Sequence, residues 1–225
     1  MALSAIIPTG LLLMADVAAI SMAELLDAYR SGYFPMADSR DAAELYWYMP
    51  EMRGVIPLEH FHVPHSLQKF LRQCPYTITI DTAFERVIRA CADSKTEKRQ
   101  DTWINDTIIA LYCQLAAEGS AHSVEVWENN ILAGGLYGVS IGGAFFGESM
   151  FSLAANASKV ALVHLVERLR KAGYVLLDTQ YVNDHLLQFG VMEIPKKDYL
   201  ECLSKALNTS PNPSTRFLTV SDIKS

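Results

Sequence analysis

Cysteine is scarce in this sequence, and no cysteine is placed to bind a metal ion. Four occur among 225 residues, at positions 74, 91, 113 and 202, with no Cys-x-x-Cys pair and no Cys/His cluster. This usage argues against a structural zinc site or a disulfide framework and indicates a reducing compartment. We therefore expect a cytoplasmic protein without a bound metal.

Long apolar runs are also missing. The segment from Ala2 to Ile20 is apolar, but Pro8 and Asp16 interrupt it. The first Arg or Lys of the chain is Arg30. A signal peptide carries a basic stretch before its apolar part, and a membrane-spanning helix needs about 20 apolar residues. We expect this segment to pack on the protein, and we expect no membrane partner.

The chain has no excess of basic residues, since 19 Lys and Arg stand against 25 Asp and Glu, for a formal net charge of −6. A general polyanion binder would be basic, so any contact with nucleic acid must be a local patch. One candidate is a helix predicted near residues 64–72, where His65, Lys69 and Arg72 share one side and could touch a phosphate backbone. The alternative is an ordinary solvated helix face.

Two common catalytic patterns are absent. The glycines at 134, 135, 138, 142 and 143 lie on or between predicted hairpin strands, not between a strand and a helix, so they do not form a dinucleotide- or phosphate-binding loop. Turns and close backbone approach explain them better. The sequence Gly147-Glu148-Ser149-Met150-Phe151 is not Gly-x-Ser-x-Gly, which argues against a serine hydrolase.

Half of the residues are hydrophobic, which is enough for one sizeable core or for a small domain docked on a larger one. Helices are predicted after a capping box at 21–24, after a cap at Thr82, over 105–119, after a cap at Asn156 and over 197–207. Strands are predicted over 76–80, 123–127, 131–140, 144–150 and 174–178. The fold class is α+β. We expect a small mixed N-terminal domain over 1–75, a larger domain with a mainly antiparallel sheet over 76–207, and a flexible tail over 208–225.

Polar residues gather at the end of the last predicted strand. Asp178 and Gln180 stand two apart and share a face in extended geometry, with Asn183 just beyond them. A carboxylate and an amide so placed could orient an amine nucleophile and donate to a developing oxyanion. The alternative is that Asp178 only caps a turn.

Glu148 follows Gly147 at the end of an apolar strand, where a carboxylate must be paired or near water. It could hold an amino group or a ribose hydroxyl; the alternative is a structural salt bridge with Lys159. Trp103, Trp47 and Phe34 could stack on a base, although core packing is the default for any one aromatic residue.

Several segments, in this order, resemble one family, the leucyl/phenylalanyl-tRNA–protein transferases. The segments are Gly32-Tyr33-Phe34-Pro35, Thr102-Trp103-Ile104, Ala121 to Trp127, Gly134 to Val139, Phe146 to Ser152, Asn156-Ala157-Ser158-Lys159, and Leu177 to His185. The resemblance spans about Leu25 to Leu203, which is most of the chain.

The resemblance implies a C-terminal domain with an acyl-CoA N-acetyltransferase-like fold. It implies transfer of Leu or Phe, and also Met, from an aminoacyl-tRNA to a protein N-terminus that bears Lys or Arg, which marks the product for N-degron proteolysis. No metal, ATP or other cofactor is needed, because the donor ester is already activated. We expect a monomer.

By matching position, Asp178 and Gln180 correspond to the residues proposed to act in peptide-bond formation, and Glu148 and Asn183 to substrate-binding positions. Trp103 matches an aromatic residue near the terminal adenosine, where Met36 replaces the Trp of many relatives. The apolar pocket would draw on Leu136, Met150 and Leu177. Leu136 also differs from the Met of some relatives, so donor preference can shift.

Two other functions fit parts of the sequence. An acyl-CoA N-acyltransferase would carry a pyrophosphate-binding loop before its long helix, and residues 151–156 lack the glycine-rich pattern of such a loop. A non-catalytic module that binds tRNA or a peptide would leave Asp178, Gln180 and Glu148 with structural roles only.

Overall fold

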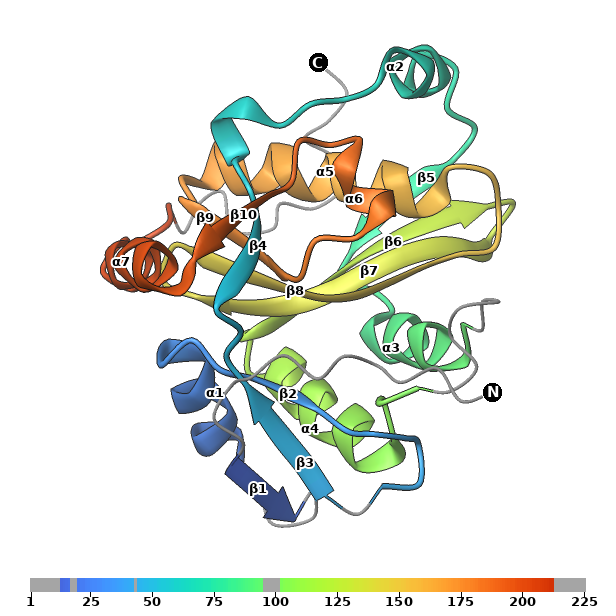
Figure 1. Ribbon diagram of the computed structural model, residues 1–225. Helices are drawn as coiled ribbons and strands as arrows, with labels where there is room; N and C mark the ends of the chain where they lie inside the picture. The colour runs from blue at the N-terminus through green and yellow to red at the C-terminus, as the bar shows by residue number, and fades with distance from the viewer. Residues whose placement is uncertain (1–12, 17–19, 43, 95–101, 213–225) are drawn as a thin grey trace, which may run out of the picture.

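Two β-sheets organise the computed structural model, which describes residues 13–16, 20–42, 44–94 and 102–212 (Figure 1). The small sheet has the antiparallel order β1-β3-β2, formed by Leu13–Asp16, Glu44–Tyr48 and Phe34–Met36. The large sheet has the order β10-β4-β9-β8-β7-β6-β5. Its strands, in chain order, are β4 (Met52–Ile56), β5 (Thr77–Ile80), β6 (Ala121–Glu128), β7 (Ile131–Ile141), β8 (Ala144–Ser152), β9 (Leu176–Gln180) and β10 (Met192–Pro195). The pair β8–β9 is parallel and the other pairs are antiparallel.

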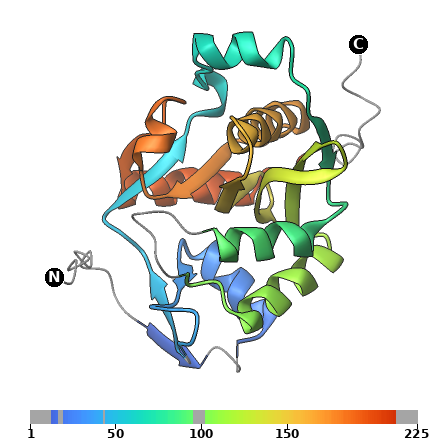
Figure 2. The ribbon, with the colours of Figure 1, turned by 90° about the vertical axis from the view of Figure 1, so that its right-hand side faces the viewer.

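Helices cover both faces of the large sheet. The helices among the described residues are α1 (Met22–Arg30), the short 3-10 helix η2 (Leu58–His60), α2 (His65–Leu71), α3 (Phe84–Asp93), α4 (Asp106–Ala117), α5 (Ala157–Ala172), α6 (Asp184–Leu187) and α7 (Lys196–Leu207). Helix α5 packs on one face, and α3 and α4 pack on the other, on the same side as α1 and the small sheet (Figures 1 and 2). Each face therefore has its own buried apolar cluster. The expected α+β class is confirmed at this coarse level.

Local sequence signals explain several element ends. The capping box at the start of α1 is confirmed, since Ser21 and Glu24 exchange hydrogen bonds. Two predicted caps are wrong. Thr82 bonds to Glu125 instead of capping α3, and the side chain of Asn156 makes no cap bond at the start of α5. There the Oγ of Ser152, from the preceding strand, accepts the free N–H of Ser158 at 3.2 Å.

Two glycines let neighbouring backbone segments of the large sheet and α5 approach closely. A Cβ on Gly134 would lie 2.5 Å from the Cβ of Ala157 in α5, and one on Gly138 would lie 2.2 Å from the carbonyl oxygen of Phe146. Neither distance is tolerated by an ordinary side chain. The backbone-approach explanation of these two glycines is therefore confirmed.

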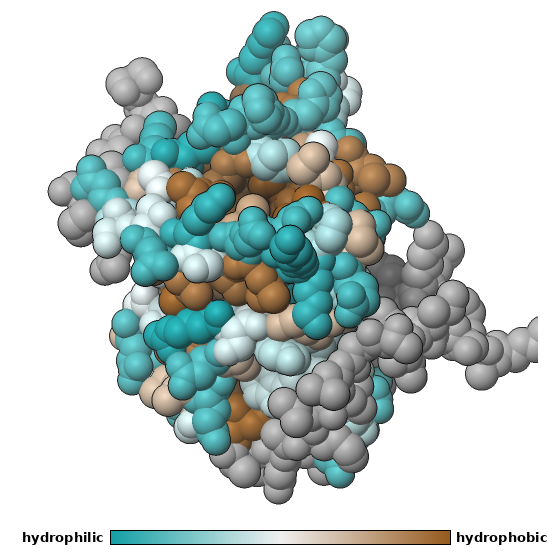
Figure 3. Space-filling model, turned by 60° about the vertical axis from the view of Figure 1, so that its left-hand side comes forward, coloured by the Kyte–Doolittle hydropathy of each residue, from teal (hydrophilic) through white to brown (hydrophobic). Residues whose placement is uncertain are grey.

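Strand β4 precedes the boundary predicted near Pro75, yet it pairs with β9 and β10 in the middle of one half of the large sheet. The division of the chain at residue 75 stays a prediction. Within the part of the chain that the structure covers, no helix is both long and apolar enough to cross a bilayer. Seen from the side of β10 and α7, the surface mixes hydrophilic residues with apolar ones gathered across its middle (Figure 3).

Candidate active site

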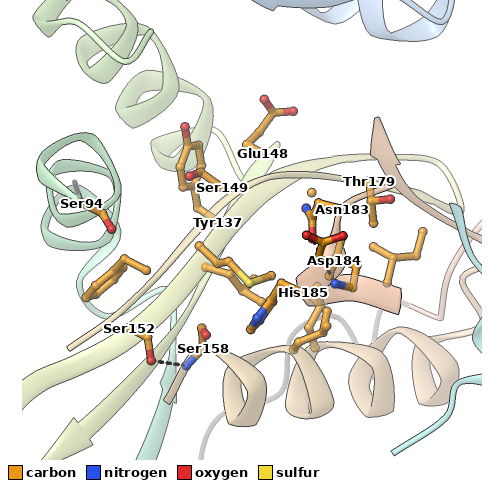
Figure 4. A pocket seen from close by; sticks show the side chains of 18 residues that line it. Ser94, Tyr137, Glu148, Ser149, Ser152, Ser158, Thr179, Asn183, Asp184 and His185 are labelled. Atoms are coloured by element: carbon orange, nitrogen blue, oxygen red, sulfur yellow. Dashed lines mark hydrogen bonds between the residues drawn. The ribbon is translucent and has the colours of Figure 1, made fainter. Parts of the chain in front are cut away.

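The only parallel pair among the described strands separates, and a cavity opens where it does. The pairing of β8 with β9 ends at Phe146 and Asp178, whereas β8 stays paired with β7 as far as Ser152. The free side of β8 therefore faces the segment that leads from β9 into α6. A cavity of about 710 Å³ lies there (Figure 4).

One wall of the cavity is apolar. Leu136 comes from β7, Met150 from β8 and Leu177 from β9, and these are the three residues that the family resemblance implied for a side-chain pocket. Helix α5 adds Leu162 and Leu165. Leu136 and Leu177 are almost fully buried, so their side chains form a fixed, water-poor surface. Such a wall is suited to an aliphatic or aromatic group.

Glu148 reaches the cavity because β8 carries a bulge. Ser149 pairs with Tyr137 and Gly147 with Gly138, so Glu148 is an extra residue without a partner on β7. A bulge re-aims the side chain of the inserted residue. Glu148 is nearly buried and is one of the residues that line the cavity, but its carboxylate points away from Asn183, Asp184 and His185 (Figure 4).

Neutral donors surround the Glu148 carboxylate. Its Oε1 accepts hydrogen bonds from the hydroxyl of Tyr29 at 2.7 Å and from Nε2 of Gln180 at 3.2 Å, and its Oε2 accepts one from the hydroxyl of Tyr112 at 3.4 Å. Burial raises the pKa of Glu148 to about 7, against the opposing effect of the Tyr29 hydrogen bond. Burial also raises the pKa of both tyrosines well above the usual value, so they stay protonated donors. Lys159 is not among the contacts of Glu148, so the salt-bridge alternative is wrong.

Gln180 occupies a strained turn at the end of β9. Its φ is 63°, a left-handed conformation that is uncommon for a residue other than glycine. The N–H of Tyr181 donates to the carbonyl of Thr179 at 2.7 Å, which closes a three-residue turn around Gln180. Gly54 of β4 makes room for this turn, because a Cβ there would lie 2.7 Å from the carbonyl carbon of Tyr181. Such strain persists where the surroundings hold it, and it is typical of functional sites.

Asp178 lies behind the cavity and not in its wall. It is fully buried, and its carboxylate accepts hydrogen bonds from Arg53, from the hydroxyl of Tyr199 at 2.7 Å and from the backbone N–H of Gln180 at 2.8 Å. The buried guanidinium of Arg53 pairs with both carboxylate oxygens, at 2.9 Å from Nε to Oδ1 and 2.7 Å from the terminal nitrogen to Oδ2. Asp178 thus touches the backbone that carries Gln180, while Gln180 touches Glu148.

Comparison with known proteins decides the family. A model of the leucyl/phenylalanyl-tRNA protein transferase family matches residues 55–204, and a model of the N-terminal domain of the same family matches residues 18–51. A leucyl/phenylalanyl-tRNA–protein transferase of Caulobacter vibrioides (strain NA1000 / CB15N) is 57% identical over 191 residues, which cover 85% of this chain and 88% of that protein. The chain belongs to this family. A transferase of the same name from Paramagnetospirillum magneticum (strain ATCC 700264 / AMB-1) is 57% identical over 183 residues, 81% of this chain and 87% of that protein.

Likeness to solved structures is weaker. The structure of L-PGS from Bacillus licheniformis aligns with a TM-score of 0.38 at 12% identity, over 74% of this chain and 54% of that chain. Membership in the leucyl/phenylalanyl-tRNA–protein transferase family rests on the sequence relatives alone.

Among the site residues predicted for a transferase of this family, Asn183 also lines the cavity, but its side-chain oxygen caps α6 by accepting the N–H of Leu186 at 3.0 Å. Trp103 and Met36 are partly buried, pack against the core cluster beside α1 and α4, and do not line the cavity. His65 and Lys69 are exposed on α2, at the top of Figure 1, and Arg72 is exposed at its C-cap.

Sequence reasoning missed four residues of the site: Tyr29, Arg53, Tyr112 and Tyr199. A signal existed only for Arg53, which sits inside the otherwise apolar stretch of β4 and so had to be a paired charge. The three tyrosines follow ordinary helical spacing of buried residues. Their contacts with Glu148 and Asp178 join segments far apart in the chain.

Proposed function

We propose that this protein transfers Leu, Phe or Met from an aminoacyl-tRNA to the α-amino group of a protein that begins with Lys or Arg, and that the product is marked for N-degron proteolysis. Membership in the leucyl/phenylalanyl-tRNA–protein transferase family supports this function. The single observation that carries it is the Glu148–Gln180 hydrogen bond beside a cavity with an apolar wall, because it places a carboxylate next to a site suited to an apolar aminoacyl group.

The chemistry requires positioning and the removal of one proton. The acceptor nitrogen attacks the carbonyl carbon of the aminoacyl ester, and the ribose oxygen of the tRNA leaves. The α-ammonium group, with an ordinary pKa of about 8, must first lose a proton. Glu148 is our proposed proton acceptor, because a pKa of about 7 lies close to the working pH. The leaving ribose oxygen takes up the second proton that the attacking nitrogen loses as the ester bond breaks.

Gln180 is proposed to hold the acceptor amine. Its Nε2 donates to Glu148, which leaves its Oε1 to accept a hydrogen bond from the amine. Both groups then approach the same nitrogen. Asp178 is fully buried and occupied by its partners, so its placement supports a role in positioning the Gln180 turn and not in direct contact with the amine.

Donor selection is proposed to reside in the apolar wall formed by Leu136, Met150 and Leu177. Pockets of this kind separate aliphatic side chains by only about 1–3 kcal/mol. Leu, Phe and Met are therefore all accepted, unequally. His65, Lys69 and Arg72 are proposed to contact the tRNA backbone, and their exposure supports this role.

The finer fold and setting are proposals as well. The mainly antiparallel sheet, with one parallel pair and helices on both faces, supports an acyl-CoA N-acetyltransferase-like fold for the larger part of the chain. We also propose a cytoplasmic monomer that needs no metal or cofactor.

A transfer assay tests the function. Purified protein is incubated with radiolabelled Leu-tRNA and a peptide that begins with Arg, beside the same peptide with an acetylated N-terminus. Label should enter only the free-amine peptide. Labelling from an acyl-CoA and not from Leu-tRNA would contradict the proposal, and so would no labelling from any charged tRNA in a panel.

A further inference from the structure

Arg53 is a buried cation at the junction of several segments. It is about 1% exposed and lies in β4, and its guanidinium sits between the rings of Phe34 and Tyr199 at 4.5 and 4.6 Å from their centroids. One terminal nitrogen donates to the carbonyl of Gly32 at 3.1 Å. Nε and the other terminal nitrogen donate to Asp178. Arg53 thereby ties β4 to β9, to α7 and to the turn before β2.

Burying a guanidinium and a carboxylate costs free energy unless their polar atoms have partners. An unpaired charge in a protein interior destabilises the fold strongly, and a hydrophobic replacement for a buried ion pair is often neutral or stabilising. Here each Asp178 oxygen accepts from a different nitrogen of Arg53, and Tyr199 adds a third donor to the carboxylate. Burial raises the pKa of Tyr199 well above its usual value, so its hydroxyl remains a donor. A buried ion pair is therefore weak evidence for a role in the stability of the fold, and the position of this pair next to the site points to another role.

The Arg53–Asp178 pair is connected to the site through one oxygen of the Asp178 carboxylate. Oδ1 of Asp178 accepts from Nε of Arg53 and also from the backbone N–H of Gln180. That N–H belongs to the residue with a φ of 63°. A strained turn of this kind stays in place only when its surroundings over-determine it. The Arg53–Asp178 pair supplies a fixed anchor on one side of Gln180, and Glu148 is the contact on the other side.

We infer that Arg53 and Tyr199 are positioning residues for aminoacyl transfer, which act by locking Asp178 and through it the turn that aims the Gln180 side chain at the acceptor amine. This inference rests on the proposed function. Neither residue touches the cavity. Their effect is on the rate of the chemical step and not on the affinity for either substrate.

The test compares single-turnover rate constants for pre-bound Leu-tRNA and an Arg-N-terminal peptide. Arg53→Lys keeps the charge but loses the two-pronged contact with Asp178, so the rate constant should fall about 10²-fold, the cost of a small misplacement of a reacting group. The KM for the peptide and the affinity for the tRNA should stay near those of the wild type. Tyr199→Phe keeps the ring beside Arg53, removes one donor to Asp178 and should give a smaller fall of the same kind.

A purely structural role has a different signature. It would lower the melting temperature and the fraction of molecules that react, while the molecules that react would keep the wild-type rate constant. Arg168→Lys is the matched control, since Arg168 of α5 is also buried and does not line the cavity. It should leave the rate constant unchanged.

The outcomes separate the two proposals. If the wild-type protein transfers no amino acid, the proposed function fails. If the wild type is active and both Arg53→Lys and Tyr199→Phe keep its rate constant, only the inference about these two residues is overturned. Should Arg53→Lys fail to fold, Tyr199→Phe alone decides, because it alters one hydroxyl group.

Discussion

Gln180 donates a hydrogen bond from Nε2 to Oε1 of Glu148 at 3.2 Å, although the two residues lie on strands whose pairing has already ended. A strained turn orients the Gln180 side chain, and a β-bulge orients the Glu148 side chain. Two local irregularities of the sheet therefore meet at Glu148, which lines the cavity, whereas Gln180 lies outside its lining. Regular strand geometry would leave the carboxylate and the amide apart.

The Glu148 carboxylate should weaken the fold above neutral pH. Its pKa is about 7 in the folded protein and 4.5 for an ordinary glutamate. Because the folded-state value is the higher one, the native protein holds the proton in this interval, so the stability is complete below about pH 4.5 and is lost as the pH rises through about 7. The loss is on the order of 3 kcal/mol.

Glu148→Gln should abolish this loss and be more stable than the wild type at pH 8, while the two proteins converge at pH 4.5. Urea unfolding at both pH values measures the free energies. Glu201→Gln, on the exposed side of α7, is the control and should behave as the wild type. Equal free energies of unfolding for the wild type at pH 8 and pH 4.5 would show that burial does not raise the pKa of Glu148.

Gln180→Gly should separate activity from stability. Glycine adopts a positive φ without a steric penalty, so the variant should stay within about 1 kcal/mol of wild-type stability. The rate of transfer should fall by about 10²-fold, because no side chain holds the amine. Asn129→Gly is a matched control, since Asn129 also has a positive φ, of 51°, in the turn between β6 and β7. A Gln180→Gly enzyme that transfers Leu at the wild-type rate would exclude Gln180 from the reaction.

Met150→Phe should change donor choice by narrowing the cavity. The larger ring occupies space beside Leu136 and Leu177, so use of Phe-tRNA should fall by about 10-fold or more relative to Leu-tRNA, within the range expected for a hydrophobic pocket. Competition between the two charged tRNAs measures the ratio. Leu153→Phe, at an exposed position outside the apolar wall, should leave the ratio unaltered. An unchanged ratio in Met150→Phe would place the donor side chain elsewhere.

Loss of both Lys69 and Arg72 should weaken tRNA binding in a salt-dependent manner. Each phosphate contact contributes about 1 to the slope of log affinity against log salt, so the double alanine variant should lose about 2. Titrations at several salt concentrations measure the slope. Lys197→Ala with Lys205→Ala removes two exposed charges from α7 instead and serves as the control. Equal slopes for the wild type and the α2 variant would remove this surface from the tRNA path.

The resemblance to the transferase family named the apolar part of the site. It implied Leu136, Met150 and Leu177 for one pocket, and the three lie together because Leu136 pairs with Met150 and Leu177 lies on the next strand, β9. Local sequence patterns could not reveal the tyrosine partners of Glu148. Tyr29 and Glu148 are 119 positions apart, and nothing in a local pattern pairs them.

The complete burial of Asp178 also could not be predicted from the neighbouring sequence. Its strand, β9, lies between β4 and β8, and Tyr199 of α7 donates to the carboxylate beside Arg53 of β4. Only the long-range pairing of β4 with β9 reveals that Arg53 pairs with the Asp178 carboxylate. The distinction between a residue that touches the amine and one that supports it therefore came from the tertiary structure.

The pH dependence of the single-turnover transfer rate tests the central claim most directly. With Leu-tRNA and the acceptor peptide already bound, the wild-type rate should rise as Glu148 ionises, with a midpoint near pH 7. Glu148→Gln should be about 10²- to 10⁴-fold slower above this midpoint and should lack the rise. A Glu148→Gln enzyme that keeps both the wild-type rate and the wild-type profile would contradict the assignment of Glu148 as the proton acceptor.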